Sequence, residues 1–243
     1  MLGDKPDTIM NVDKSSFDAV VEDTTTTIED IMVADSMIES TEKTVPSSKT
    51  IIELLRHGEL EGAEIFRGST DDQLTDNGWQ QMVSTINGKD GWDIIITSPL
   101  SSCREFAEVI AQEDEIDLEI NKEFKEIDFG EWEDKTPNQI IKEDASLLEA
   151  WWQSPTQVTP PSGEDFYDFR ARVLKAYKEI LREYKGKRIL LVTHSGVIRV
   201  ILMNVLGMQD DRLFSLNIDY ASFSKIQIEI DDSRDFGTLI KHY

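Results

Sequence analysis

From residue 49 onward, hydrophobic and polar positions follow two different periods along the chain. Short runs of consecutive apolar residues are typical of strands buried on both faces. Such runs occupy residues 50–55, 93–97, 118–120 and 188–193. Strict alternation of apolar and polar positions over residues 223–230 predicts one more strand, which we expect to close the chain.

Segments with helical spacing of apolar residues fill the intervals between these runs. Helices are expected after Thr75, from the Ser98-Pro99 pair as N-cap and first-turn proline, from Pro137 toward Trp151-Trp152, over residues 166–184, and from Ser195 to a stop at Gly207. Strands that alternate with helices indicate an α/β protein. The sequence therefore predicts a three-layer α/β/α sandwich on a mostly parallel sheet.

Residues 1–48 differ in composition from the rest and set the domain organisation. They hold 11 acidic and 3 basic side chains, one aromatic residue (Phe17), a run of four threonines and the linker-like Val45-Pro46-Ser47-Ser48. Such a composition predicts an acidic, disordered tail followed by one domain over residues 49–243. Two alternatives remain open: a short helix over residues 28–38, or a translation start at Met37.

Charge and composition exclude several classes of function. The 243 residues carry a net charge of −23, and the 39% hydrophobic residues suffice for one large core. Such an excess of carboxylates repels polyanions, so neither nucleic acid nor a membrane surface is an expected partner. One cysteine, no apolar span and no signal-like start make the cytoplasm the expected location.

The histidines stand where the predicted parallel strands end. Ligands of open α/β sheets bind beyond the carboxyl ends of the strands. His57 follows the first strand and His194 follows the strand at 188–193, whereas His242 lies beside the C-terminus, where we expect solvent. One histidine alone is more often structural than catalytic, but two at strand ends, one directly after Arg56, favour a shared site.

Three kinds of site use histidines in such places. A metal centre lacks a third ligand, because Cys103 falls on a helix face and no His-x-x-x-His pair occurs. The glycine-rich motifs of nucleotide-binding loops are absent. Nucleophilic attack on phosphorus remains, since a neutral imidazole attacks without deprotonation and arginine binds phosphoryl oxygens in bidentate fashion. Arg56, Arg67 and Arg199 are candidate phosphate ligands, with a surface charge as the alternative for the last two.

An ordered set of short motifs runs through residues 49–230. In chain order they are Leu55-Arg56-His57-Gly58-Glu59, Arg67-Gly68, Leu74-Thr75-x-x-Gly78, Ser98-Pro99-Leu100, Glu126-x-x-Phe129-Gly130-x-Trp132-Glu133, Gly163-Glu164 and Val192-Thr193-His194-x-Gly196-Val197-Ile198-Arg199. This set resembles the histidine phosphatase superfamily, the phosphoglycerate mutase-like proteins. The Phe-Gly-x-Trp-Glu segment and the Gly-Val-Ile-Arg ending are most similar to the α-ribazole phosphatase-like branch, which removes phosphate from a cobalamin precursor.

The resemblance implies a role for each matching residue. It implies a phosphohistidine intermediate on His57, with Arg56 and His194 on the phosphoryl oxygens and no metal or other cofactor. Glu126 would protonate the departing alkoxide and then activate water, which agrees with the raised pKa of a carboxyl group in a desolvated pocket. Glu59 is expected either to orient an arginine or to cap the next helix.

Ser102 departs from the family pattern. After Ser-Pro-Leu the family has one variable residue and then an arginine of the phosphate pocket, and that arginine position is Ser102. Arg104 lies two residues later, which on a helix is a rotation of about 200°, so it should point away unless the helix start shifts. The loss of one charged donor costs about 10²- to 10³-fold in rate. Ser102 and Arg104 both remain candidates for the phosphate pocket.

Two functions therefore remain. The first is a metal-independent phosphatase that hydrolyses a small phosphorylated metabolite. The alternative is a catalytically weakened family member that binds a phosphorylated ligand or protein. Specificity is expected from residues 126–163, where Trp132, Trp151 and Trp152 either wall a pocket or pack in a core, with packing favoured for the last two. Phe129 and Trp132 follow Glu126 closely and are the better candidates for contact with the leaving group.

Overall fold

A mixed six-stranded sheet forms the centre of the fold. The computed structural model describes residues 49–62, 65–230 and 235–243, so the expectations for residues 1–48 lie outside the described residues. Its strands are β1 (Lys49–Arg56), β2 (Ile94–Thr97), β3 (Leu118–Ile120), β4 (Arg188–Thr193), β5 (Phe223–Ile230) and β6 (Asp235–His242). The sheet order is β3-β2-β4-β1-β5-β6, with β1 to β4 parallel and β5 and β6 antiparallel. The expected mostly parallel sheet is confirmed.

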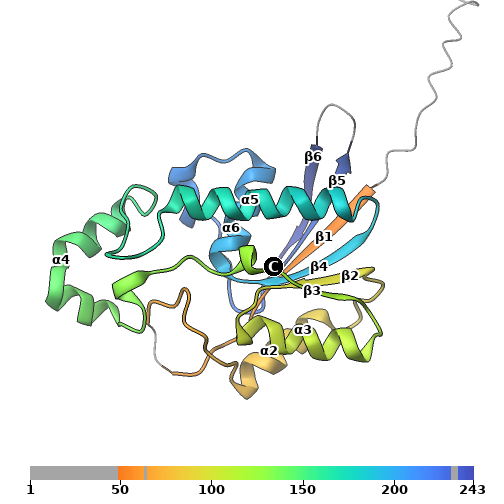
Figure 1. Cartoon of the computed structure of the whole chain (residues 1–243), viewed down its shortest axis with the longest axis horizontal. Helices are drawn as coiled ribbons and strands as arrows, with labels where there is room; N and C mark the ends of the chain where they lie inside the picture. The colour runs from red at the N-terminus through yellow and green to blue at the C-terminus, as the bar shows by residue number, and fades with distance from the viewer. Residues whose placement is uncertain (1–48, 63–64, 231–234) are drawn as a thin grey trace, which may run out of the picture. The chain divides into compact units, whose positions relative to one another are not determined.

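Helices cover both faces of this sheet. They are α2 (Asp76–Ile86), α3 (Ser101–Glu113), α4 (Pro137–Gln153), α5 (Phe166–Glu183) and α6 (Ser195–Leu206), with short 3₁₀ turns η1 (Lys122–Phe124), η2 (Gly130–Trp132) and η3 (Asp210–Ser215). In Figure 1, α5 and α6 lie on one side of the sheet and α2 and α3 on the other, which is the predicted three-layer sandwich. Helix α4 lies beside these layers rather than on the sheet.

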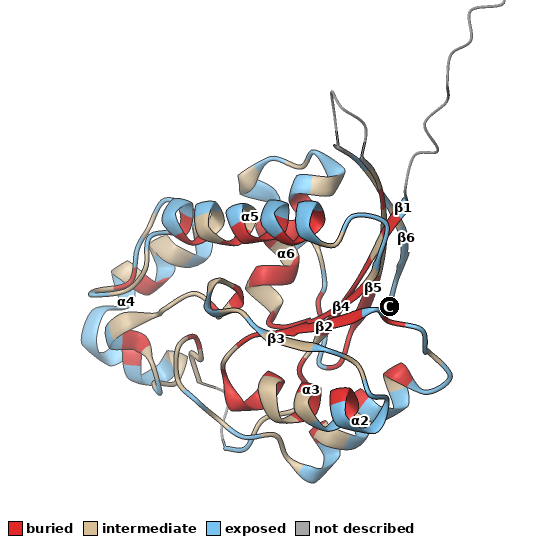
Figure 2. Cartoon of the chain, turned by 45° about the vertical axis from the view of Figure 1, so that its right-hand side comes forward, coloured by how far each residue is buried: buried red, intermediate tan, exposed pale blue. Residues whose placement is uncertain are grey.

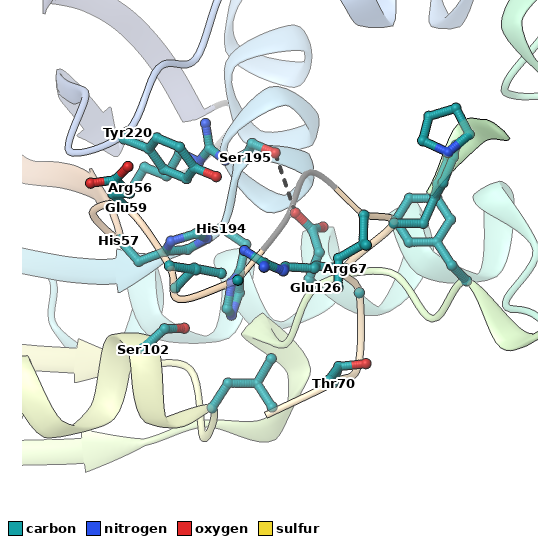
Figure 3. A pocket seen from close by; sticks show the side chains of 18 of the residues that line it. Arg56, His57, Glu59, Arg67, Thr70, Ser102, Glu126, His194, Ser195 and Tyr220 are labelled. Carbon is teal, nitrogen blue, oxygen red and sulfur yellow. Dashed lines mark hydrogen bonds between the residues drawn. The ribbon is translucent and has the colours of Figure 1, made fainter. Parts of the chain in front are cut away.

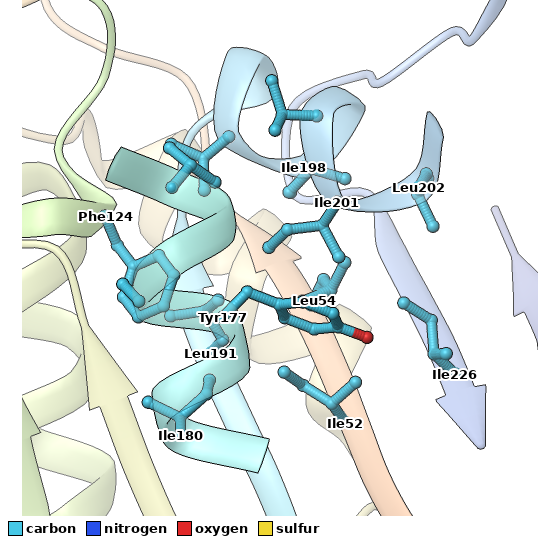
Figure 4. Close-up of a cluster of buried hydrophobic side chains, with 14 of the residues drawn as sticks. Ile52, Leu54, Phe124, Tyr177, Ile180, Leu191, Ile198, Ile201, Leu202 and Ile226 are labelled. Atoms are coloured by element: carbon cyan, nitrogen blue, oxygen red, sulfur yellow. The ribbon is translucent and has the colours of Figure 1, made fainter. Parts of the chain in front are cut away.

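Alternation along the central strands supplies both hydrophobic cores. Leu54 of β1 and Leu191 of β4 belong to the core shared with α5 and α6 (Figure 4), and their chain neighbours Leu55 and Val192 belong to the core shared with α2 and α3. Successive side chains of a strand point to opposite faces. A continuous apolar run therefore fills two cores at once, which is why the central strands are buried over most of their length (Figure 2).

Helix α4 builds a smaller third core. Thr136 caps it through a reciprocal hydrogen-bond pair with Gln139, and Pro137 occupies its first turn. The helix is kinked at Asp144, where φ is −154° and ψ is 88°. The buried residues of this core are Trp132, Ile140 and Leu148, packed against the partly buried Phe66, Phe129, Leu147 and Trp151. The outer helix is therefore anchored by aromatic side chains from other segments.

Two sequence expectations about elements were wrong. Helix α3 begins at Ser101 rather than at Ser98-Pro99, because the Ser98 hydroxyl is bonded to His194 and the carboxylate of Asp71 accepts from the Ser101 amide at 2.6 Å. Strand β5 does not close the chain, since β6 follows it and pairs antiparallel with it. His242 ends β6, where its ring is exposed but bonded to the Ser224 hydroxyl at 2.8 Å. In the part of the chain that the structure describes, no helix is long and apolar enough to cross a bilayer.

Candidate active site

The ends of three neighbouring parallel strands bring the sequence candidates together. His57 follows β1, Ser98 follows β2 and His194 follows β4, and these strands are adjacent in the sheet. The ring centroids of the two histidines lie 5.2 Å apart. Glycine at position 58 lets the backbone after His57 lie directly against Gly78 of α2, because a Cβ there would come within 2.0 Å of the Gly78 carbonyl oxygen.

His57 is held in one tautomer. Its Nδ1 lies 2.8 Å from the carbonyl oxygen of Gly58, which can only accept, so Nδ1 carries the proton and Nε2 keeps its lone pair. Burial lowers the pKa of His57 to about 3, and the positive charge of Arg56 contributes. The imidazole is therefore neutral at physiological pH and can act as a nucleophile.

Arg56 supplies the positive charge beside this imidazole. Its guanidinium donates to the carbonyl oxygen of Ile218 at 2.7 Å, and its Cζ lies 4.3 Å from the ring centroid of Tyr220. Among the described residues, its buried Nε has no hydrogen-bond partner. Buried donors are almost always satisfied, so this nitrogen is suited to an anion. Figure 3 shows Arg56, His57 and Tyr220 together on one side of the cavity.

His194 lies deeper than His57. Its Nε2 is 2.7 Å from the Ser98 hydroxyl, and the Cys103 thiol lies 3.7 Å from the same nitrogen. Burial lowers the pKa of His194 well below its ordinary value, and the neighbouring His57 contributes. Two neutral imidazoles can share this confined space because neither holds a charge.

Glu126 lies between η1 and η2 in the chain, and its buried carboxyl group contacts the first turn of α6. One of its oxygens accepts from the Gly196 amide at 2.8 Å and the other from the Ile127 amide at 3.0 Å. A Cβ at Gly196 would come within 2.3 Å of that carboxyl group, so glycine makes room for it. Burial raises the pKa of Glu126 against the opposing effect of these hydrogen bonds. A carboxyl group with a raised pKa can act as a proton donor.

Arg172 of α5 holds the segment that carries Glu126. Its guanidinium donates to the carbonyl oxygens of Glu123, Lys125 and Glu126 at 2.7, 2.9 and 3.1 Å. Glu164 in turn binds Arg172 through two hydrogen bonds of 2.6 and 2.9 Å. Arg172 therefore fixes the backbone next to the candidate acid, a role that nothing in its sequence surroundings indicates.

A cavity of about 690 Å³ joins these groups. Its polar lining residues are Arg56, His57, Glu59, Arg67, Thr70, Ser102, Glu126, His194, Ser195 and Tyr220 (Figure 3). Its aromatic lining residues besides Tyr220 are Phe66, Phe129, Trp151, Trp152 and Phe214. Across the described residues, no group of three His, Cys, Asp or Glu side chains is placed to hold a metal ion.

Two of the weaker candidates have structural partners. Arg67 lines the cavity and forms an ion pair with Asp72, whose Oδ2 lies 3.0 Å from the arginine Nε. Glu59 accepts from the Asn77 side chain at 2.6 Å and from the Thr75 hydroxyl at 3.3 Å, so it fastens the start of α2. Of the two roles expected for Glu59, the structure shows the one at the next helix.

The three remaining candidates are placed differently. Ser102 is buried and lines the cavity. Arg104 does not reach the cavity, because its guanidinium turns along α3 to Glu108 at 3.1 Å and to Ser101 at 3.3 Å, in agreement with the rotation expected on a helix. Arg199 lines a smaller adjoining cavity of about 150 Å³ that it shares with Glu126, and its Nε donates to the Leu216 carbonyl.

The tryptophans depart in part from their expected positions. Trp132 is 3% exposed and packs in the core beneath α4, so the prediction that it contacts the leaving group was wrong. Trp151 packs against that core, as expected, and also lines the cavity, whereas Trp152 lines the cavity and is 51% exposed. Phe129 lines the cavity as expected. Closeness to Glu126 in the sequence does not fix the direction in which a side chain points, because η2 turns the Trp132 side chain into the core beneath α4.

Comparison with known proteins gives this geometry a family. A family model of the histidine phosphatase superfamily, branch 1, matches residues 52–234. The chain belongs to this superfamily. The match covers every strand end and helix start that contributes to the site, so the predicted resemblance is confirmed.

Relatives of this histidine phosphatase family member include named phosphatases. The adenosylcobalamin/alpha-ribazole phosphatase of Escherichia coli is 26% identical over 190 residues, which cover 76% of this chain and 92% of the relative. The bifunctional protein Rv2228c of Mycobacterium tuberculosis is 31% identical over 183 residues, 73% of this chain and 50% of that protein. The chain thus spans about half the length of its mycobacterial relatives.

Solved structures agree with this family assignment. The alpha-ribazole phosphatase of Shigella flexneri superposes with a TM-score of 0.68 at 26% identity, covering 78% of this chain and 94% of the other. YhfR of Bacillus stearothermophilus superposes with a TM-score of 0.71 at 27% identity, covering 79% and 96%. The phosphoglycerate mutase-like fold is therefore confirmed for this superfamily member.

Several residues of the site were not found from the sequence. Tyr220 stacks on Arg56, Ser98 binds His194, and Phe214 enters the cavity from η3. Ser98 was visible only as a helix cap. Tyr220 and Phe214 lie far along the chain from every motif except the last, so no local pattern places them at the cavity.

Proposed function

We propose that this protein is a metal-independent phosphatase that hydrolyses small phosphomonoesters through a phosphohistidine on His57. The observation that carries the proposal is the neutral His57, with Nδ1–H bound to the Gly58 carbonyl and Nε2 left as a nucleophile beside Arg56. The named phosphatases among the relatives support hydrolysis of a phosphate ester.

The first step transfers the phosphoryl group to the enzyme. Nε2 of His57 attacks phosphorus, the bond between phosphorus and the leaving oxygen breaks, and that oxygen takes the proton of Glu126. Arg56 balances the charge on the phosphoryl oxygens with its permanent positive charge. The neutral ring of His194, whose centroid lies 5.2 Å from that of His57, also borders the phosphoryl group.

The second step returns the enzyme to its starting state. The Glu126 carboxylate takes a proton from water, the water oxygen attacks phosphorus, and the bond between nitrogen and phosphorus breaks. Inorganic phosphate leaves and His57 is again a neutral imidazole. Glu126 is buried and held by two backbone amides, so the same group serves both steps without a rearrangement.

Turnover of p-nitrophenyl phosphate in EDTA tests this proposal. We expect release of phosphate by the unaltered protein and a loss of about 10⁴-fold or more in His57→Gln. His242→Gln is the matched control, because that ring lies at the end of β6 and does not line the cavity. Acid quenching should trap nothing, and alkaline quenching should trap a radiolabelled phosphoryl group, because phosphohistidine is acid-labile. Inactivation by EDTA, or full activity of His57→Gln, would contradict the mechanism.

A second candidate function rests on Ser102. Two guanidinium groups that could replace the absent arginine have other partners, since Arg104 is bound to Glu108 and Arg67 is paired with Asp72. The site then suits a protein that binds a phosphorylated ligand with little turnover. Saturable binding of inorganic phosphate or a phosphonate, together with no turnover of any monoester, would favour this second function over the first.

A further inference from the structure

The cavity is much larger than its phosphate-binding end requires. Cavities of roughly 300–1,000 Å³ enclose drug-sized ligands, and this one measures about 690 Å³. Arg56, His57 and His194 occupy one region of its wall, at the strand ends. The remainder is available to the part of the substrate that is not phosphate.

Aromatic side chains from four segments line that remainder. We call them the aromatic bay: Phe66 after β1, Phe129 before η2, Trp151 and Trp152 at the end of α4, and Phe214 in η3. Trp151 is at the centre of the group, with ring centroids 5.5 Å from Phe66, 5.9 Å from Phe129 and 5.9 Å from Phe214, all in edge-to-face contact. In an edge-to-face contact one ring turns its edge to the face of the other, so these contacts fix the orientation of the rings around Trp151.

The aromatic bay is not a closed core. Trp152 and Phe214 are 51% and 53% exposed, while Phe66, Phe129 and Trp151 are half-buried. The buried core of this region consists of Trp132, Ile140 and Leu148, against which Phe66, Phe129 and Trp151 pack, whereas Trp152 and Phe214 are not part of it. Large apolar side chains gathered at a cavity, beyond what the core uses, indicate a ligand that covers them.

Glu126 connects the bay to the reacting atoms. The adjoining cavity of about 150 Å³ is lined by Glu126 together with Phe129, Trp151 and Phe214 of the bay. In the proposed function, Glu126 protonates the leaving oxygen. The body of the leaving group therefore extends from Glu126 into the aromatic bay.

Charge in the bay argues against a second phosphate group on the substrate. Of its two nearby arginines, Arg67 is paired with Asp72, and Arg199 donates to a backbone carbonyl and lies 5.6 Å from the Phe214 ring. A second phosphate would need free, convergent cationic donors. Flat aromatic rings instead match the edge-to-face walls.

We propose that the aromatic bay is the leaving-group site and selects phosphomonoesters of alcohols that carry a flat aromatic ring system. Trp151 and Phe214 are the specificity-determining residues. This inference rests on the proposed function for its catalytic readout. Binding of phosphonates tests it independently, because a phosphonate needs no turnover.

A series of substrates with the same reacting bond tests the proposal. Ethyl, cyclohexylmethyl, benzyl and 2-naphthylmethyl phosphate all release primary alcohols, so their need for Glu126 is alike. We expect kcat/KM for the naphthylmethyl ester to exceed that for the ethyl ester by about 10- to 100-fold, from burial of apolar area and ring contacts. Benzyl phosphate should exceed cyclohexylmethyl phosphate by about threefold or more.

Variants locate this selectivity. Trp151→Leu and Phe214→Leu are each expected to reduce the naphthylmethyl-to-ethyl ratio about 10-fold, mainly through KM, and to leave ethyl phosphate within about threefold. Phe236→Leu is the matched control, an exposed phenylalanine on β6 that does not line the cavity. The ratio is internal to each variant, so a change in the amount of folded protein does not alter it.

The outcomes separate the inference from the proposed function. Similar kcat/KM for all four esters, or equal values for benzyl and cyclohexylmethyl phosphate, would overturn the aromatic class while the phosphatase stands. If no ester is turned over, the proposed function fails. The inference is then decided by fluorescence titration, in which 2-naphthylmethyl phosphonate should bind about 10- to 100-fold tighter than ethyl phosphonate and lose this preference in Trp151→Leu. Equal affinities would overturn it.

Discussion

The two ends of the cavity are built in different ways. The polar end consists of Arg56, the last residue of β1, and of His57 and His194, which directly follow β1 and β4 and are buried. The aromatic bay comes from two loops, a kinked outer helix and a 3₁₀ turn, and two of its rings are more than half exposed. The polar end is fixed by the sheet, whereas the bay depends on elements outside the three layers.

This difference separates chemistry from specificity. Groups on strand ends are positioned by many backbone hydrogen bonds and by two cores, so they suit a reaction that must be the same for every substrate. Side chains on peripheral helices and loops can vary without disturbing the sheet. Changes at the polar end should therefore affect all esters by one factor, and changes in the bay should affect them unequally.

Among the variants compared on both ethyl and 2-naphthylmethyl phosphate, Glu126→Gln has the largest expected effect. Loss of the proton donor should lower kcat/KM for ethyl and 2-naphthylmethyl phosphate by the same factor, about 10² to 10⁴. With p-nitrophenyl phosphate, whose leaving group departs without a proton, a rapid burst of about one equivalent of nitrophenol should remain before slow turnover. Stopped-flow absorbance measures the burst.

The matched control for this variant is Glu131→Gln. Glu131 is exposed and bonded to the Ser162 hydroxyl, away from the cavity lining. It should leave kcat/KM unchanged. A Glu126→Gln variant that affects one ester far more than another would show that the polar end and the bay are not separable.

Ser102→Arg tests whether the polar end lacks a charge. Ser102 already faces the cavity, so a guanidinium there should raise kcat/KM for every ester, by up to about 10²-fold. Ser102→Met, with a long uncharged side chain, is the control for volume. Steady-state kinetics that show no gain in kcat/KM for Ser102→Arg would mean that Arg67 or Arg199 already supplies this positive charge.

Much of the fold could be predicted because its signals are local. Strands β3 and β4 have the predicted bounds, since continuous apolar runs mark strands buried on both faces, and α6 ends at Gly207, whose φ is 63°. The polar end followed from strand ends and the family resemblance. Strand β6 was missed because it is a polar, glycine-containing edge strand that pairs with β5 alone.

The rest depends on contacts between distant segments. The start of α3 was misplaced because its cap comes from Asp71, 30 residues earlier. Trp151 reaches the cavity because α4 returns to it, whereas Trp132 is turned away from Glu126 by a 3₁₀ turn. The spacing of residues in the sequence does not indicate where the side chains of Trp151 and Trp132 point. The bay was therefore predicted less well than the polar end.

The pH dependence of stability also distinguishes the two ends. The pKa of His57 is about 3 in the folded protein against an ordinary value of 6.5. Between these pH values residue 57 binds more protons in the unfolded chain than in the folded protein. The contribution of His57 to the free energy of unfolding is therefore fully present above pH 6.5 and is lost as the pH falls toward 3. From about pH 6.5 to about pH 4.5, the unaltered protein should lose about 2 kcal/mol more free energy of unfolding than His57→Gln.

Phe214→Leu supplies the comparison for this measurement. No titratable group is removed there, so its free energy of unfolding should differ from that of the unaltered protein by an amount that does not change with pH. Urea titrations at several pH values measure both differences. Parallel pH profiles for His57→Gln and the unaltered protein would mean that burial does not suppress protonation of His57.

The smallest effect concerns Tyr220, which lies beside Arg56 and His57 at the polar end. Its ring stacks on Arg56 with 4.3 Å to Cζ and lies 5.9 Å from the His57 ring, and it also lines the cavity. A cation–π contact of an exposed ring such as Tyr220 contributes about 0.5–1 kcal/mol, so Tyr220→Leu should lower kcat/KM about 2- to 5-fold and Tyr220→Phe much less. If Tyr220 positions Arg56, the loss is equal for ethyl and 2-naphthylmethyl phosphate. A loss confined to the naphthylmethyl ester would instead assign Tyr220 to the aromatic bay.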